Sequence, residues 1–238
     1  MTHYFLQESN LENSRASRIA WLLEELNVDY EIKAYPRTKE YLAPKELLDV
    51  FPTGMSPVLT IIKEGSEPLT IGESGHIVNY LIEYYDKDGK FTPKTHNDKE
   101  LVDFYLHFSE GSIQPHLVSI LVGNIAGQKV PWPFRFVTNQ VFSKMNSTFY
   151  AKRLFTNFRY LDDQLAKKGG GYFVGDHLTG ADFMLDFPIN NGLFLDRADL
   201  VGQGKDMKKE FPNLYKWSQM IKKEPLRIKA DEEAKAKL

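Results

Sequence analysis

Residues 54–85 read GMSPVLTIIKEGSEPLTIGESGHIVNYLIEYY, and the spacing of the apolar residues changes within this segment. One apolar, β-branched run begins at Val58 and a second begins at Leu69, after the turn Gly65-Ser66, so the two runs predict a hairpin. After the hairpin the apolar residues recur at helical spacing as far as Tyr84. We therefore expect two antiparallel strands followed by a helix.

The residues before this segment predict a strand, a helix, a second strand and a short helix. The apolar run Tyr4-Phe5-Leu6 is expected to be a buried strand, followed by a polar loop. Apolar residues at i, i+3, i+4 and i+7 begin at Ile19 and predict an amphipathic helix with Asn13 or Ser14 as its N-cap. Apolar and charged residues then alternate over residues 28–34, as in a half-exposed strand.

This order of elements predicts the fold class. Within residues 1–86 it is typical of an α/β thioredoxin-like domain, in which helices cover both faces of a mixed sheet of four strands. Residues 86–97 are charged and contain Gly89 and Pro93, so we expect a linker there. Residues 97–238 are expected to form an all-α C-terminal domain.

Three sequence patterns predict the helices of the C-terminal domain. Apolar residues at helical spacing predict a long helix over residues 102–117, and a second is expected from Pro133, in its first turn, to Lys168. The segment Thr179-Gly180-Ala181-Asp182 has the spacing of a capping box ahead of a buried helix. A last helix around Trp217 is expected to precede a charged tail.

The composition excludes several classes of function. Thirty Lys and Arg residues against 32 Asp and Glu residues give a formal charge of -2, so no overall basic field is available to hold nucleic acid or an anionic membrane. The chain contains no Cys, which excludes disulfides, thiolate metal sites and a nucleophilic protein thiol. The six His residues show no paired metal-ligand spacing, so we expect no metal site.

The sequence also predicts where the protein is found. No apolar run has the length of a signal peptide or of a membrane-spanning helix, so we expect a cytoplasmic protein. The last residues, Ala236-Lys237-Leu238, come close to the Ser-Lys-Leu address of peroxisomal proteins. A chance match in a tail rich in Lys, Ala and Glu is the alternative.

Three motifs of the first domain resemble those of the cytosolic glutathione S-transferases. Ser14-Arg15-Ala16-Ser17-Arg18, followed by Trp21-Leu22-Leu23-Glu24-Glu25-Leu26, looks like the first-helix signature of the Ser-type branch of fungi and bacteria. Gly54-Met55-Ser56-Pro57-Val58-Leu59 resembles that family's glycine-x-x-Pro-Val-Leu, in which the proline is cis, and Glu73-Ser74 matches its acidic-residue-Ser pair. The resemblance covers the whole chain.

The resemblance implies an enzyme that conjugates the glutathione thiolate to hydrophobic electrophiles, as in detoxification. It implies a homodimer with glutathione as co-substrate and with no metal or redox cofactor. Two alternatives stay open: a glutathione-binding regulatory module without transferase turnover, and a glutathione-dependent peroxidase or disulfide reductase.

The resemblance also implies a glutathione site. Beside the cis Pro57, the backbone of Ser56 would pair with the tripeptide like an extra strand. Glu73 would take the ammonium of the γ-glutamyl group, and Ser74, at a helix N-terminus, would take its carboxylate. Each residue has an ordinary structural alternative, because a proline can simply open a strand and a serine can simply cap a helix.

Two cations and one hydroxyl complete the predicted glutathione site. Arg37 and Lys45 could pair with the glycyl carboxylate, or be solvated loop cations. Ser14 is the catalytic candidate, because a hydrogen bond to the charged sulfur is worth roughly 1.5–3 kcal/mol and the following helix dipole adds ~0.3–1 kcal/mol. Together they could lower the thiol pKa by roughly one to three units.

Ser14 has rivals. It could act only as a helix cap, and Asn13 and Ser17 are close enough to serve instead. Tyr4 lies too early and inside the predicted strand, which argues against a tyrosine mechanism.

The resemblance also implies a pocket for the electrophile, between the first loop and the fourth helix. Within the segment from Phe104 to Ser112 we select Phe108 and Ser112, one turn apart. The alternative is that these residues are core packing, which is usual for aromatic residues at helical spacing.

Overall fold

The computed structural model describes residues 2–8, 15–36, 38, 42–195 and 198–236. Its first part contains a four-stranded sheet with the order β2-β1-β3-β4. β1 pairs in parallel with β2 and antiparallel with β3, and β3 pairs antiparallel with β4. The strands are β1 (Thr2–Glu8), β2 (Glu31–Ala34), β3 (Val58–Lys63) and β4 (Leu69–Gly72). This mixed sheet confirms the predicted fold class.

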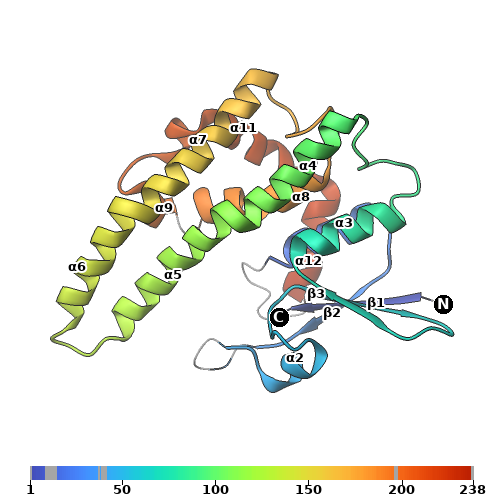
Figure 1. Ribbon diagram of the computed structural model, residues 1–238, viewed down its shortest axis with the longest axis horizontal. Helices are drawn as coiled ribbons and strands as arrows, with labels where there is room; N and C mark the ends of the chain where they lie inside the picture. Colours follow the sequence, from blue (N-terminus) through green and yellow to red (C-terminus); the bar gives the residue numbers. More distant parts are fainter. Residues whose placement is uncertain (1, 9–14, 37, 39–41, 196–197, 237–238) are drawn as a thin grey trace.

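Helices cover both faces of this sheet. Figure 1 shows α3 above the strands and α2 below them, and α1 packs beside α3. These helices are α1 (Ser17–Glu25), α2 (Lys45–Val50) and α3 (Ser74–Tyr85). The N-cap position of α1 is Ala16, so the cap predicted at Asn13 or Ser14 is wrong. The helix begins later because its buried face begins with Ala16 and Arg18, which pack into the interior.

The second part is all helical. Two long helices each contain a π-helical turn, which inserts one residue into the helical repeat: η1 joins α4 to α5, and η2 joins α6 to α7. The elements are α4 (His96–Phe108), η1 (Ser109–Ile113), α5 (Gln114–Lys129), α6 (Arg135–Met145), η2 (Asn146–Tyr150), α7 (Ala151–Lys168), α8 (Gly180–Phe187), η3 (Pro188–Leu193), α9 (Ala198–Gly202), α10 (Met207–Glu210), α11 (Pro212–Ile221) and α12 (Pro225–Ala236).

Both predicted long helices are confirmed, with one correction at a terminus. Pro133 lies in a turn before α6 rather than in the first turn of the helix, which begins at Arg135. At the other end, α7 stops at Lys168 because Gly169 adopts a left-handed conformation, with φ +84°, that favours glycine.

The two parts share one hydrophobic core. The ring of Trp21 in α1 meets the ring of Phe183 in α8 edge-on, with centroids 4.5 Å apart. Every residue of α8 is buried. The predicted capping box is present at the start of α8, formed by Thr179 and Asp182.

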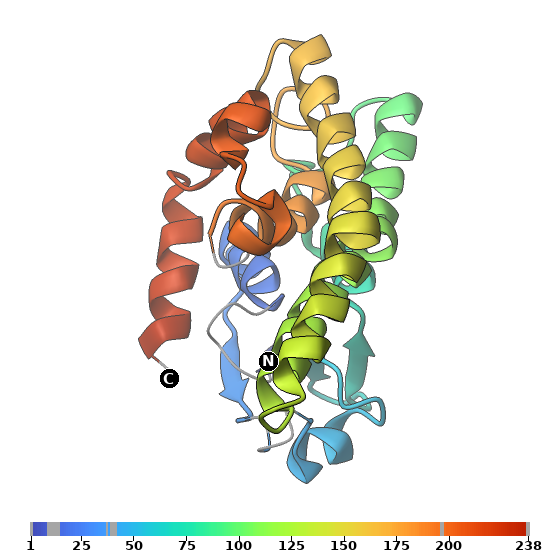
Figure 2. The same cartoon turned by 90° about the vertical axis from the view of Figure 1, so that its left-hand side faces the viewer.

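The charged tail predicted after α11 is instead a helix, α12. Figure 2 shows α12 running beside the first domain, and it packs on α1. Ala230 and Ala234 are buried, and Lys229 Nζ lies 2.6 Å from Glu24 Oε2. The prediction failed because the buried side of this helix consists of small residues and long charged chains, which give little hydrophobic pattern. Lys237 and Leu238 lie outside the described residues.

Candidate functional site

The structure brings two of the predicted motifs together at one end of the sheet. Ser56 and Pro57 precede β3, while Glu73 and Ser74 follow β4. Because Val58 of β3 is paired with Gly72 of β4, the two motifs are neighbours at that end of the hairpin.

The Ser56–Pro57 peptide bond is cis, as the resemblance implies. Both residues are buried, with Ser56 9% exposed. Gly54, just before them, has φ +62°, and an added Cβ would lie 2.7 Å from Leu48 and 2.8 Å from Ala43. This turn therefore requires glycine both for its backbone conformation and for its close packing.

Glu73 has an uncommon backbone conformation at the start of α3. Its φ of +65° and ψ of 115° lie outside the regions that L-residues ordinarily occupy. Its side chain is exposed, whereas Ser74, the first residue of α3, is only 2% exposed. Residues held in such conformations cluster at ligand sites, and the N-terminus of a helix attracts anions. This end of the sheet can therefore receive a ligand that carries both an ammonium and a carboxylate.

The side chain of Lys45 forms an ion pair within α2. Lys45 is the first residue of α2, and its Nζ lies 2.8 Å from Asp49 Oδ2 in an exposed pair one turn apart. Such pairs contribute only ~0.3–0.5 kcal/mol, so Lys45 could exchange this partner for a ligand carboxylate at little cost. Arg37 lies outside the described residues.

The predicted catalytic residue Ser14 and its rival Asn13 also lie outside the described residues. The other rival, Ser17, is half-buried at the start of α1. The roles of these three residues remain predictions.

An ion-pair cluster at the start of α1 was not predicted from the sequence. Arg15 Nη1 lies 3.0 Å from Glu110 Oε2, and Arg18 Nη1 lies 2.9 Å from Glu110 Oε1. One signal could have revealed it: Arg18 lies one turn before Leu22, on the buried face of a helix, where a charge needs a partner.

Of the predicted electrophile residues, Phe108 directly precedes the π turn η1 and Ser112 lies within it. Phe108 is half-buried and stacks on Phe104, with centroids 5.2 Å apart, and it meets Tyr160 edge-on. Asn157 Nδ2 donates to the backbone oxygen of Ser112 over 2.7 Å. These contacts join α4 and η1 to α7, while the role of Phe108 and Ser112 in binding an electrophile stays a prediction.

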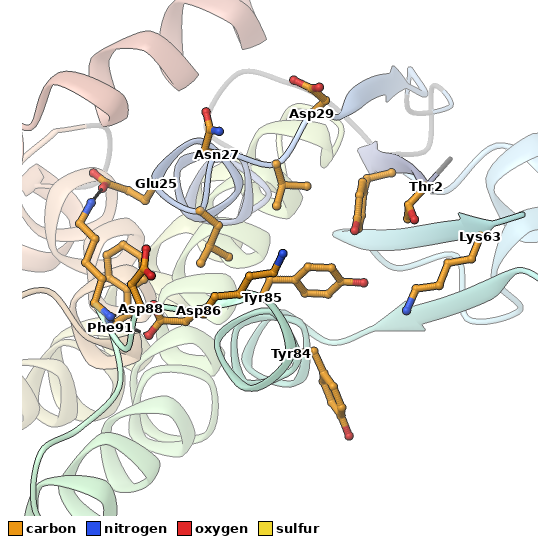
Figure 3. Close-up of a pocket in the computed structure, with 15 residues that line it drawn as sticks. Thr2, Glu25, Asn27, Asp29, Lys63, Tyr84, Tyr85, Asp86, Asp88 and Phe91 are labelled. Atoms are coloured by element: carbon orange, nitrogen blue, oxygen red, sulfur yellow. Dashed lines mark hydrogen bonds and ion pairs between the residues drawn. The ribbon is translucent and has the colours of Figure 1, made fainter.

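A large cavity lies at the opposite end of the first domain. Its volume is about 790 Å³, and it is formed by the start of β1, the end of α1, the end of α3 and the linker. Figure 3 shows Tyr85 and Lys63 on one side of it and Glu25, Asp86 and Asp88 on the other. The 12 residues of α3 separate it from Ser74 by ~18 Å, at ~1.5 Å per residue. The cavity and the predicted glutathione site are therefore separate features.

The described residues contain neither a group of metal-binding side chains nor a helix that could span a membrane. Within those ranges no three His, Asp or Glu side chains are grouped so that they could hold a metal ion. No helix within them is long and apolar enough to cross a bilayer.

Two family models match the chain. The model described as "Glutathione S-transferase, N-terminal domain" matches residues 14–83, and the model described as "Glutathione S-transferase, C-terminal domain" matches residues 132–230. The first match contains all three motifs on which the resemblance depends.

Two fungal proteins and two solved structures are similar over almost the whole chain. Glutathione S-transferase 3 of Schizosaccharomyces pombe is 32% identical over 216 residues, which are 91% of this chain and 82% of that protein. Glutathione S-transferase 1 of Saccharomyces cerevisiae is 28% identical over 228 residues, 95% of this chain and 94% of that protein.

Both solved structures are of the yeast prion protein Ure2p. Its complex with glutathione superposes with a TM-score of 0.72 at 22% identity, over 95% of this chain and 97% of that one. The nitrogen regulation fragment of the same protein superposes with a TM-score of 0.71 at 20% identity, over 96% of both chains. At this identity the likeness shows the fold alone. The match to the S. pombe transferase, together with the two domain models, establishes that this chain belongs to the glutathione S-transferase family.

Proposed function

We propose that this protein is a glutathione transferase that conjugates glutathione to hydrophobic electrophiles, with glutathione as co-substrate and no metal or redox cofactor. The observation that carries the proposal is the pairing of Val58 with Gly72, which puts the cis Ser56–Pro57 bond beside Glu73 and Ser74. The curated relatives named as glutathione S-transferases support it.

Each residue at this end of the sheet has a role in holding the tripeptide. The backbone of Ser56 pairs with the peptide backbone of glutathione as an added strand would. The N-terminus of α3 and the Ser74 hydroxyl bind the γ-glutamyl carboxylate, while Glu73 binds the ammonium. Lys45 and Arg37 balance the charge of the glycyl carboxylate.

The reaction requires a thiolate at neutral pH. In this proposal the Ser14 hydroxyl donates a hydrogen bond to the sulfur after the thiol has released its proton to solvent. The sulfur then forms a bond to the electrophilic carbon, and with an aryl halide the carbon–halogen bond breaks and halide leaves. Phe108 and Ser112 contribute to the pocket for the apolar reactant. Conjugation makes such compounds more polar, which suits detoxification.

The purified protein tests the proposal directly. We expect it to be retained on immobilised glutathione and to conjugate members of a panel of aryl halides, enals and isothiocyanates. Absence of both retention and conjugation would contradict it.

A glutathione-binding regulatory module is the second candidate, favoured by the likeness to the nitrogen regulation fragment of Ure2p. Tight glutathione binding without turnover on any electrophile would select it. A glutathione-dependent peroxidase or disulfide reductase needs no protein thiol if two glutathione molecules share the site, and assays with a hydroperoxide and a small disulfide distinguish it.

We further propose that the protein is a homodimer. Helices α5 and α6 expose a row of apolar side chains: Val118, Val122, Val137, Val141 and Met145. In a two-fold dimer this surface meets the same surface of a second copy, and burial of these apolar side chains would stabilise the pair.

The site of action is proposed to be the cytoplasm. The tripeptide Ala236-Lys237-Leu238 is the one feature that favours the peroxisome instead. A fluorescent protein fused to the N-terminus, with and without the last three residues, tests whether they direct import.

A further inference from the structure

The loop between α5 and α6, with the first turn of α6, carries the three most exposed large apolar side chains among the residues that the structure describes. Trp132 is 85% exposed, Phe136 71% and Phe134 66%. We call these three residues the aromatic tip. Figure 1 shows this loop at the left-hand edge of the molecule. A single exposed apolar side chain is ordinary, but three aromatic side chains within five residues form a patch that marks a contact surface.

The helix that carries the aromatic tip is held without it. No residue of α6 is buried, and the helix packs against α5. Gly123 and Gly127 of α5 permit this close packing, because an added Cβ at these positions would collide with Phe142 and Asn139 of α6. Contacts of this kind fix α6 on α5, so the large exposed area of the tip is not explained by the packing of the helix.

Cations flank the aromatic tip. Lys129 is the last residue of α5, and Arg135 is the first residue of α6. Arg135 Nε donates to the backbone oxygen of Val130 over 3.3 Å, which holds this cation beside the loop. From residue 111 to residue 161 the sequence contains six Lys and Arg residues and no Asp or Glu, although the whole chain has a formal charge of -2. The tip therefore has a local basic character that the overall charge conceals.

The combination of aromatic and basic side chains fits the surface of a membrane. Trp and Phe side chains are favoured at the level of the lipid headgroups, where the indole N–H also finds a polar partner. Lys and Arg side chains are attracted to anionic headgroups, and their stems can cover apolar surface. A projecting tip can enter the headgroup layer, whereas a small ligand or a peptide is usually bound in a groove.

A second copy of the chain fits the aromatic tip less well. In a two-fold contact between two tips, each cation would approach its own counterpart, and like charges repel each other. The apolar row proposed above for the dimer does not include the three aromatic side chains of the tip. Membrane contact and dimerisation can therefore be tested with different variants.

We propose that the aromatic tip docks this protein on the surface of a bilayer that contains anionic phospholipid. The rings of Trp132, Phe134 and Phe136 enter the headgroup layer, while Arg135 and Lys129 contact the anionic headgroups. The contact is peripheral, since no helix in the described part of the chain could cross a bilayer. The inference does not rest on the proposed function, although hydrophobic electrophiles would be concentrated in the same bilayer.

Tryptophan fluorescence tests the contact without any substitution. The chain contains three Trp residues, and Trp21 and Trp217 are only 1% and 2% exposed, so Trp132 is the one that reports on the surface. Vesicles of phosphatidylcholine with about 30% phosphatidylserine should shift its emission to shorter wavelength, and brominated lipid should quench it. No change of emission, together with no co-sedimentation with these vesicles, would overturn the inference.

Two variants separate the apolar contribution from the charged one. Replacement of all three aromatic residues of the tip by Ser should weaken binding to these vesicles by at least ~10-fold, because the inserted apolar area is lost. Arg135→Gln should weaken it by ~5-fold, as expected for one cation near an anionic surface. Binding of the wild-type protein should also weaken in ~0.5 M salt. Unchanged binding of the triple variant, or equal wild-type binding to phosphatidylcholine alone, would overturn the inference.

Matched controls lie at the other end of the same long helix. Leu101→Ser and Lys99→Gln replace an exposed apolar and an exposed basic residue of α4, and Lys99 is ~45 Å from Lys129 along the helix at ~1.5 Å per residue. Both should bind vesicles as the wild type does. Losses equal to those of the tip variants would mean that binding is not specific to the tip.

Two further measurements complete the test. Trp132→Phe keeps an aromatic side chain, so it should co-sediment with the vesicles but lose the emission shift. The triple variant should keep the melting temperature and the sedimenting mass of the wild type, because its substitutions are at exposed positions. A lower mass with unchanged vesicle binding would show that the tip contacts a second copy of the chain instead, which would overturn the inference.

Discussion

Trp217 in α11 donates its indole N–H to Oδ1 of Asp182 in α8 over 3.1 Å, and Asp182 is fully buried. The same oxygen accepts from the backbone N–H of Phe173, while Oδ2 accepts from the backbone N–H and the hydroxyl of Thr179. One carboxylate thus caps α8 and ties it to α11 and to the loop after α7.

Replacing Asp182 is expected to destabilise the protein strongly. Asp182→Ala leaves four buried donors without their acceptor, so the free energy of unfolding should fall by at least about 3 kcal/mol. Thr179→Ala removes one side of the capping box and should cost ~1 kcal/mol. Urea denaturation measures both, with Asp163→Ala, an exposed position on α7, as the control. A loss below about 1 kcal/mol for Asp182→Ala would contradict this account.

Asp182 should also make stability depend on pH. Burial raises its pKa to about 6, against an ordinary value of 3.8. Between these values the folded protein keeps a proton that the unfolded chain has released, so stability falls as the pH rises through this window. The difference in unfolding free energy between wild type and Asp182→Asn should change by roughly 2 kcal/mol from pH 4 to pH 7, as the wild type loses this stabilisation. A difference that stays constant would show that this carboxyl does not titrate there.

Ser14→Ala tests the thiolate chemistry. Loss of one charge-assisted hydrogen bond should raise the apparent pKa of conjugation by about one to two units while glutathione affinity changes little. Rates measured from pH 5.5 to 9 beside a thermal melt distinguish this from a structural role. An unmoved profile with a lowered melting temperature would transfer the role to Asn13 or Ser17.

The packing of α12 predicts a steric effect near the C-terminus. Ala230 is 1% exposed, so Ala230→Leu overfills its site and should lower the free energy of unfolding by about 1–3 kcal/mol. Ala236→Leu, at an exposed position of the same helix, should change it by less than about 0.5 kcal/mol. Equal effects of the two substitutions would mean that α12 does not pack as described.

The proposed dimer predicts a change of mass. Val141 on α6 is 53% exposed, and Val141→Lys places a charge in the middle of the apolar row. Sedimentation should give the wild-type protein a mass of about twice the chain mass of 27.4 kDa. The mass measured for the variant should be closer to that of a single chain. Ile228→Lys, at an exposed apolar position of α12 that is outside this row, is the control. A wild-type protein that sediments as one chain would contradict the dimer.

The candidate site could be predicted only in part. Glu73 and Ser74 could be selected from the sequence because an acidic residue and a serine before a helical pattern form a local motif, and their roles in binding stay predictions. The cluster of Arg15, Arg18 and Glu110 was not found, because its members are up to 95 positions apart. The π turn that brings Glu110 into reach has no pattern of its own, since one inserted residue hardly disturbs the spacing of apolar residues.

The sequence by itself determined the order of the strands and helices, the capping box at Thr179 and the family motifs, because each depends on residues within about two turns of one another. Only the tertiary structure decided that Arg18 is buried against Glu110, that the end of the chain forms α12, and that Pro57 lies beside Ser74. These relationships depend on how separate elements pack, and the free energy of such contacts comes from residues that are far apart in the chain.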